Sequence, residues 1–287
     1  MNREDPAALD PSNAAQAEYW NGPGGQRWTV HQAVLDRSLA PFGAALLDRS
    51  APSRGHRVLD IGCGCGDTSL AFADRVGDAG AVLGVDLSNE MLERARERAA
   101  GRPQVRFLAA DAARLAAQEP FDRIVSRFGV MFFGEPVAAF RHLRSLLHPQ
   151  GRLAFVCWRP FEENSWGRVP MEAVRRALPD AGGPAEPGAP GPFAFADPDR
   201  VRQVLEDAGF PRPHIEPVDA DVVFSTGDLG EAVEFALYAG PSARLLAGAD
   251  AAAIARARAE LAKALAPYRN DRGIALRGAS WLVTSGV

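Results

Sequence analysis

Lysine is almost absent from this chain, and its scarcity excludes two large classes of enzyme. Lys263 is the only lysine among the 32 lysine and arginine residues, and it lies in the alanine-rich stretch AAAIARARAELAKALA, which predicts a surface helix. A P-loop requires Gly-Lys-Ser/Thr, and a Schiff-base enzyme requires a lysine in its pocket. The sequence therefore argues against both classes. The absence of H-E-x-x-H and G-x-S-x-G likewise disfavours zinc metalloproteases and α/β-hydrolases.

Cysteine is also scarce, and Cys63, Cys65 and Cys157 are the only three. Three thiols cannot all pair with one another, and their spacing does not form a disulfide framework. Metal-binding pairs usually follow C-x₂₋₄-C, and structural zinc takes four ligands. We therefore predict no metal site and interpret Cys63 and Cys65 as small residues that fill a turn.

Long apolar runs and basic tracts are missing as well. No uncharged apolar run approaches the roughly 18–20 residues that a membrane span needs. The start, MNREDPAALDPSNAAQAEYW, is acidic and polar, unlike a secretory signal or a transit peptide. The formal net charge of −4 does not fit a nucleic-acid partner, which needs a basic face. We therefore expect a cytoplasmic protein that binds neither membranes nor nucleic acid.

The composition, 47% hydrophobic and 24% charged over 287 residues, is that of a globular protein. Short apolar runs alternate with helix-period segments between residues 57 and 158. The pattern predicts strands over 56–61, 81–86, 104–109, 121–126 and 152–158, and helices over 67–76, 89–100 and 136–147, the last closed by a turn at 148–151. Such alternation predicts a doubly wound α/β fold whose ligand lies beyond the carboxyl ends of parallel strands.

Both ends of the chain are less regular. We expect a helix over 28–48 despite Pro41, a mobile Pro/Gly-rich loop over 179–192, and helices over 198–208, 229–239 and 250–265. Further strands over 215–224 and 274–284 complete a mostly parallel, seven-stranded sheet. The expected division is a helical N-terminal cap (1–50), a ligand-binding core (51–160), and a C-terminal part (161–287) with covering helices and the last strands. The apolar C-terminal third either covers the pocket or pairs two subunits in a homodimer.

A glycine-rich turn follows the first strand, in the stretch VLDIGCGCGDTSL from Val58 to Leu70. Glycines let the chain turn sharply and let a ligand approach bare backbone. A dinucleotide site prefers G-x-G-x-x-G, but the third position counted from Gly62 is Asp67. Asp60 within the strand would repel a pyrophosphate and would suit an ammonium group. The spacing D-x-G-x-G-x-G therefore favours a different ligand from NAD.

These residues resemble the class I S-adenosylmethionine-dependent methyltransferases, over about residues 57–160. Three further motifs extend the resemblance: the acid in GVDLS, the S-x-x-M-L start of the next helix, and LLHPQGRLAFV. The last resembles the family pattern L-x-P-G-G, with Gln150 in place of a glycine. YWNGPGGQRW near the N-terminus and SRFGVMFF resemble a bacterial small-molecule subgroup. The resemblance implies a Rossmann-like fold and S-adenosyl-L-methionine as cofactor, with S-adenosyl-L-homocysteine as product.

The resemblance also assigns roles to particular residues. It implies that the glycine turn holds the methionine part, that Asp60 faces its ammonium group, and that Asp86 binds the ribose hydroxyls. It further implies that Met91 packs on adenine and that Asp111 accepts from the adenine amino group. The full predicted cofactor set is Asp60, Gly62, Cys63, Gly64, Asp67, Thr68, Asp86, Leu87, Met91, Asp111, Ala112 and Ser126.

Candidates for the acceptor pocket follow strand ends or lie in the cap. They are Trp20, Trp28, Arg127, Trp158, Arg159 and Trp166. The tryptophans could face the cofactor's sulfonium group as cation–π partners or could anchor the cap. Among the five histidines only His31 could reach the pocket, so His31 and Arg127 are the only catalytic candidates and no base is assigned.

We therefore predict methyl transfer to a small-molecule acceptor (an O, S, N or C nucleophile) by in-line displacement. Because no base stands out, we hypothesise an acidic acceptor, such as a phenol, enol, carboxylic acid or thiol, guided by Arg127. Two alternatives stay open: an NAD(P)-dependent oxidoreductase, which Asp67 disfavours, and a non-catalytic cofactor-binding protein on the same fold.

Overall fold

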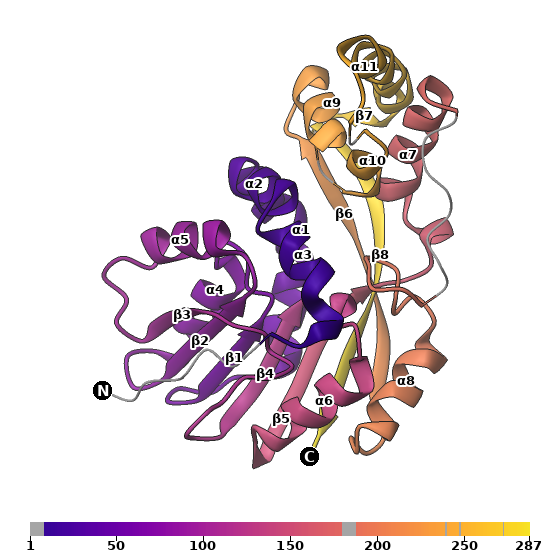
Figure 1. Cartoon of the computed structure of the whole chain (residues 1–287). Helices are drawn as coiled ribbons and strands as arrows, with labels where there is room; N and C mark the ends of the chain where they lie inside the picture. The colour runs from indigo at the N-terminus through magenta and orange to yellow at the C-terminus, as the bar shows by residue number, and fades with distance from the viewer. Residues whose placement is uncertain (1–8, 180–187, 239, 247, 272) are drawn as a thin grey trace.

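A single mixed sheet organises the chain (Figure 1) in the computed structural model, which describes residues 9–179, 188–238, 240–246, 248–271 and 273–287. Its strands lie in the order β3-β2-β1-β4-β5-β8-β6. They are β1 (Arg57–Ile61), β2 (Ala81–Asp86), β3 (Val105–Ala109), β4 (Phe121–Arg127), β5 (Leu147–Trp158), β6 (His214–Ser225) and β8 (Gly273–Gly286). The short β7 (Arg269–Asn270) pairs only with the start of β8.

The first five strands are parallel and the last two long ones are antiparallel. β1 pairs in parallel with both β2 and β4, so the strand order reverses at the end of β1. β8 pairs antiparallel with both β5 and β6. The predicted seven-stranded, mostly parallel sheet is therefore confirmed, and the reversal puts the ligand-binding crevice at the carboxyl end of β1.

The connecting helices form where their capping residues predict them. Helix α4 (Asp67–Val76) and strand β2 match the predicted bounds. Helix α5 (Asn89–Arg98) begins after Ser88, whose hydroxyl accepts from the backbone N–H of Met91 at 3.4 Å. Helix α8 (Pro198–Asp207) begins after Asp197, whose carboxylate accepts from the backbone N–H of Asp199.

Two predictions about the secondary structure are wrong, and a third lies partly outside the described residues. The predicted turn at 148–151 is wrong, because β5 already starts at Leu147, which pairs with Phe121, and helix α6 (Pro136–Ser145) ends before it. The predicted helix over 28–48 is interrupted at His31, between α2 (Pro23–Val30) and α3 (Gln32–Ser50). Of the predicted loop over 179–192, residues 180–187 lie outside the described residues.

The strands β6 and β8 are longer than the parallel strands and extend beyond them to a second group of helices (Figure 1). This group contains α7 (Ser165–Ala177), α9 (Leu229–Tyr238), α10 (Gly240–Leu245) and α11 (Ala251–Leu265). Helices α9 and α11 match predicted elements, whereas α7 and α10 had no predicted counterpart. These helices pack on one another and on the far part of β6 and β8.

The N-terminal segment lies between this helical group and the parallel strands (Figure 1). It consists of the short turn η1 (Pro11–Asn13) and helix α1 (Ala14–Trp20), followed by α2 and α3. Helix α3 packs on β4, β5, β6 and β8, and its Phe42 and Leu46 are completely buried. The cap is thus part of the hydrophobic core and is not a detachable extension.

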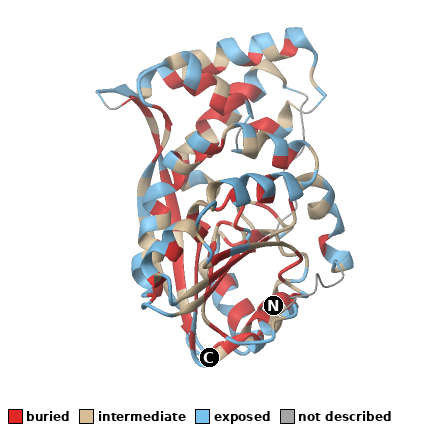
Figure 2. Cartoon of the chain, turned by 90° about the vertical axis from the view of Figure 1, so that its left-hand side faces the viewer, coloured by how far each residue is buried: buried red, intermediate tan, exposed pale blue. Residues whose placement is uncertain are grey.

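Buried residues follow the strands through the centre of the molecule (Figure 2). The segment of β5 from Leu153 to Trp158 is buried throughout, as expected of a strand with helices on both faces. Among the helices that the structure describes, none is both long enough and apolar enough to cross a membrane.

Candidate active site

The glycine turn after β1 is a place where two stretches of backbone touch. Gly62, Gly64 and Gly66 all have positive φ, of 65°, 53° and 84°. A Cβ at Gly62 would lie 2.8 Å from the Cα of Gly129 in the segment after β4. Only glycine allows both this conformation and this approach. The turn therefore leaves bare backbone at the crevice where the strand order reverses.

Asp60 lies buried behind this turn with half of its carboxylate unpaired. The hydroxyl of Ser69 donates to its Oδ2 at 2.6 Å, whereas Oδ1 has no hydrogen-bond partner among the described residues. Burial raises the pKa of Asp60 to about 7. A buried acceptor atom without a donor is costly, so this oxygen fits a site that a cationic or water-bridged ligand completes.

Asp86 joins the glycine turn to the start of α5. Its carboxylate accepts from the backbone N–H of Gly64 at 2.8 Å and from that of Ser88 at 2.9 Å. Burial raises the pKa of Asp86. These two bonds fix the carboxylate at the end of β2 with its edge on the crevice.

Asp111, after β3, holds the N-terminal segment in place. Its Oδ2 accepts from the backbone N–H of Asp10 at 3.0 Å and from the side-chain amide of Asn13 at 2.8 Å. Its Oδ1 accepts from the backbone N–H of Ala113. The acid that sequence reasoning assigned to a ligand thus also anchors the cap across about one hundred residues of sequence.

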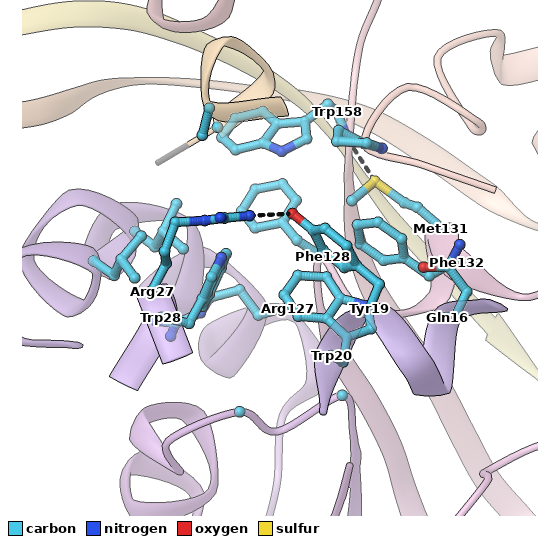
Figure 3. A pocket seen from close by; sticks show the side chains of 18 of the residues that line it. Gln16, Tyr19, Trp20, Arg27, Trp28, Arg127, Phe128, Met131, Phe132 and Trp158 are labelled. Carbon is cyan, nitrogen blue, oxygen red and sulfur yellow. Dashed lines mark hydrogen bonds between the residues drawn. The ribbon is translucent and has the colours of Figure 1, made fainter. Parts of the chain in front are cut away.

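One cavity of about 820 Å³ extends from the glycine turn into the space below the C-terminal helices. Gly62, Gly64, Asp86 and Met91 line one part of it, and aromatic side chains dominate the rest. Figure 3 shows part of this wall, with Trp20 and Trp28 from the cap and Trp158 from the end of β5. A volume of this size lies in the upper part of the range for small-molecule sites, roughly 300–1,000 Å³.

The aromatic wall is built around a strained residue. Phe128 has φ of 62°, which is rare for a bulky side chain. Its backbone N–H donates to Val156, and its ring stacks on Trp158 with centroids 3.9 Å apart and planes at 11°. Across the cap, Trp20 meets Trp28 and Phe132 edge to face. The stack on Trp158 holds Phe128 in a conformation that its own backbone disfavours.

Arg127, at the end of β4, is the only arginine on the described cavity wall that forms an ion pair with a carboxylate of the described residues. Its Nη1 donates to Asp67 Oδ2 at 2.7 Å, and its side chain is only 10% exposed. Asp67 in turn meets Arg98 at 3.5 Å, and Arg98 also pairs with Asp36. This chain of charges fixes Arg127 at the boundary between the glycine turn and the aromatic wall.

Comparison with known proteins places these features in a family. A family model described as a methyltransferase domain matches residues 58–151. A demethylmenaquinone methyltransferase from Thermus thermophilus is 32% identical over 193 residues, which are 62% of this chain and 86% of that protein. The chain belongs to the class I S-adenosylmethionine-dependent methyltransferases.

Two further methyltransferases show how far the similarity extends. An aklanonic acid methyltransferase from Streptomyces sp. (strain C5) is 36% identical over 118 residues, 40% of this chain and 54% of that protein. The chain thus spans about half the length of that relative. A Haemonchus contortus phosphoethanolamine N-methyltransferase, solved with S-adenosyl-L-methionine, covers 94% of this chain with a TM-score of 0.56 and 16% identity, and the chain covers 59% of it. That likeness is one of fold alone.

The residues at the glycine turn fit the cofactor of this methyltransferase. The unpaired Oδ1 of Asp60 suits an ammonium group through water, and the bare turn admits a close main-chain contact. The carboxylate of Asp86 has an edge on the cavity that suits two hydroxyl donors. Membership of the family also sets aside the NAD(P)-dependent alternative.

The structure separates the predicted cofactor set into two groups. Seven of its residues line the cavity: Gly62, Gly64, Asp86, Leu87, Met91, Asp111 and Ala112. The other five do not line the cavity and lie behind the lining residues or beside them: Asp60, Cys63, Asp67, Thr68 and Ser126. Of these, Ser126 donates from its hydroxyl to Ile61 at 2.8 Å and accepts from the N–H of Gly129, so it supports the turn from below.

The acceptor candidates also divide. Trp20, Trp28, Arg127, Trp158 and Trp166 all line the cavity. Arg159 does not line it. Its guanidinium pairs with Glu163 and Asp219 and lies 4.9 Å from the ring centroid of Trp281.

His31, Cys63 and Cys65 are not among the residues that line the cavity, although His31 and Cys63 are next to residues that do. His31 stacks on Tyr238, and burial lowers its pKa. Burial raises the pKa of Cys63 well above its ordinary value, and that of Cys65 to about 11. No group of three or more potential metal-ligating side chains occurs within the described ranges.

Sequence reasoning missed much of the acceptor side of this methyltransferase. Tyr19 and Arg27 stood in the quoted cap motif, and Phe128 and Phe132 in SRFGVMFF, but none was singled out. Glu162, Arg175, Tyr238 and Arg244 gave no local signal, because only tertiary packing brings them to the cavity.

Proposed function

We propose that this methyltransferase transfers a methyl group to a small, flat, largely apolar acceptor that carries an acidic group. The observation that carries the proposal is one continuous cavity, with the glycine turn and Asp86 on one part of its wall and stacked aromatic rings on the rest. Flat acceptors suit such a wall because aromatic rings pack best against parallel or edge-on faces.

The acidic character of the acceptor follows from the side chains available. No histidine, lysine or cysteine occurs among the described residues that line the cavity. An amine or alcohol needs a base to remove its proton, whereas a phenol, enol, carboxylic acid or thiol ionises readily in water. Arg127, fixed by Asp67 at the boundary between the two parts, would favour the ionised form of the acceptor.

Each part of the chain has a role in this proposal. S-adenosylmethionine supplies an electrophilic methyl group whose bond to sulfur breaks as the acceptor atom bonds to it in line. Asp60, Asp86 and the glycine turn of the 51–160 core hold the cofactor, and Asp111 and Met91 bound the adenine end. The cap (1–50) and the C-terminal part (161–287) cover the acceptor and exclude water. Orientation of this kind can contribute about 7–11 kcal/mol to lowering a barrier.

The names of two relatives agree with this acceptor class. One acts on demethylmenaquinone and another on aklanonic acid, and both names denote small molecules. We propose the same general class for this chain and neither compound in particular.

An acceptor panel with isotopically labelled cofactor tests the proposal. Flat phenols, enols, carboxylic acids and thiols are compared with plain amines and alcohols, and labelled products are identified by mass spectrometry. We expect transfer to the acidic group only. Turnover of plain amines or alcohols alone would reject the proposal, and Asp86→Ala serves as the inactive reference.

A further inference from the structure

Methyl transfer as proposed leaves three arginines of the cavity wall unused, Arg27, Arg175 and Arg244. Arg27 of α2 and Arg244 of α10 both line the cavity, although they come from opposite ends of the chain. The Cζ of Arg27 lies 6.0 Å from the ring centroid of Tyr19, and the Cζ of Arg244 lies 4.9 Å from the same centroid. Arg27 also donates to the Tyr19 hydroxyl at 3.2 Å, as Figure 3 shows. Tertiary structure has thus gathered two cations at one ring.

Neither guanidinium is neutralised by a carboxylate of the described chain. Their partners among the described residues are the ring and the hydroxyl of Tyr19. Arg127, on the same cavity wall, has an acid: it pairs with Asp67 at 2.7 Å. The face of a tyrosine ring attracts each cation but cannot cancel the repulsion between them. The pair therefore forms an electropositive place on the wall of a largely aromatic cavity, with Arg27 half-buried and Arg244 exposed.

The pair comes from other elements of the fold than the residues that fit the cofactor. Those residues lie at the ends of β1 and β2, whereas Arg244 belongs to α10, next to the cavity-lining Ala243 and Leu245. Tyr19 and Arg27 belong to the cap. A molecule in contact with both guanidinium groups would therefore touch the cap and the C-terminal helices at once, which are the two parts that surround the aromatic space.

We propose that Arg27, Arg244 and the Tyr19 hydroxyl form a subsite for an anionic substituent of the acceptor, remote from the atom that is methylated. The subsite takes a carboxylate, sulfonate or phosphate whose oxygens accept charge-assisted hydrogen bonds from both guanidinium groups. The flat body of the acceptor then lies against the aromatic wall. This inference rests on the proposed function, since it names a second feature of the same substrate.

Binding measurements on the full-length protein saturated with S-adenosylhomocysteine test the subsite without any need for turnover. The probes are 2-naphthoate, 2-naphthalenesulfonate and the neutral 2-naphthamide, which share one flat body. We expect both anions to bind about tenfold more tightly than the amide, the size of one charge-assisted hydrogen bond. That preference should fall below about threefold in Arg27→Gln and in Arg244→Gln.

One variant serves as the control and one as the competitor. Arg176→Gln removes a charge from α7 away from the cavity lining, and it should keep the full preference for the anions. Arg127→Gln is the competitor, because the proposed function places Arg127 at the acidic group of the acceptor; the subsite requires that the preference depends on Arg27 and Arg244 as well. Thermal melting shows whether each variant is folded.

Several results would overturn the subsite. Equal binding of anions and amide overturns it and leaves the proposed function standing. Collapse of the preference in Arg127→Gln alone assigns the anion to Arg127. If Arg27→Gln weakens S-adenosylhomocysteine binding about tenfold and leaves the anion preference unchanged, the guanidinium holds the cofactor's carboxylate instead. Failure of all three probes to bind overturns the subsite together with the flat acceptor of the proposed function.

Discussion

The two parts of the cavity are built in opposite ways. The part at the glycine turn comes from one contiguous stretch, from Asp60 at the end of β1 to Met91 in α5, and its contacts are backbone hydrogen bonds and strand ends. The aromatic part collects side chains from the cap, from the ends of β4 and β5, and from the C-terminal helices. The comparison teaches that the first part can be conserved as a unit while the second can be rebuilt for a different acceptor by changes at scattered positions.

Asp86→Ala should produce the largest effect, and it should affect only the part at the glycine turn. The proposed bonds to two hydroxyl groups would be lost, so S-adenosylhomocysteine should bind about 100-fold more weakly in calorimetry. Asp122→Ala is the matched control, since Asp122 is the second residue of β4 and accepts from the backbone N–H of Arg57 away from the cavity lining. Unchanged affinity in Asp86→Ala would contradict the assigned role.

The pH dependence of cofactor binding tests the same part at Asp60. Burial raises the pKa of Asp60 from 3.8 to about 7 in the folded protein. Between these two pH values the folded protein keeps a proton on Asp60 that the unfolded chain has released. The stability of the ligand-free protein should therefore fall as pH rises from about 4 to 7. Binding of the cofactor's ammonium group needs the ionised carboxylate of Asp60. The affinity for S-adenosylhomocysteine should therefore change in the opposite sense and rise about tenfold from pH 6 to pH 8. Calorimetry at both pH values with Asp60→Asn, whose binding should not vary, checks this; a flat profile in the natural chain would refute it.

Phe128→Leu should affect only the aromatic part and by a smaller amount. The stack on Trp158 would be lost while most of the apolar volume remains. Aromatic pairs contribute about 0.5–1.5 kcal/mol beyond burial, so a flat acceptor should bind about three- to tenfold more weakly. The affinity for S-adenosylhomocysteine should stay within about twofold. Equal losses for both ligands would show that the two parts of the cavity are not independent.

Glu162→Gln should have the smallest effect. Glu162 is the only acidic residue on the described cavity wall besides Asp86 and Asp111. If the acceptor ionises by itself, kcat at pH 8 should change by less than about twofold, whereas loss of a general base typically costs about 100-fold or more. A loss of the larger size would place a base on the aromatic part and would remove the argument for an acidic acceptor.

The secondary structure around the glycine turn could be predicted from the sequence. Helix and strand bounds between residues 57 and 127 followed from local signals, such as the Ser88 cap and the positive φ that the glycines permit, because those signals act over a few residues. The error at 148–151 arose because Pro149 and Gly151 read as turn residues, whereas β5 continues through them with a shift of its register against β4, from Leu147 opposite Phe121 to Arg152 opposite Arg123.

The aromatic part of the cavity depends on contacts between distant segments of the chain. The stack of Phe128 on Trp158, the anchoring of the cap by Asp111, and the meeting of Arg27 and Arg244 at Tyr19 join residues from about thirty to more than two hundred positions apart. No local pattern encodes such meetings, because each joins elements that only the folded chain brings together: the ends of β4 and β5, the segment after β3 with the cap, and the cap with α10. Local geometry thus fixed the glycine turn that we propose for the methyl donor, and long-range packing fixed the shape and charge of the cavity opposite it.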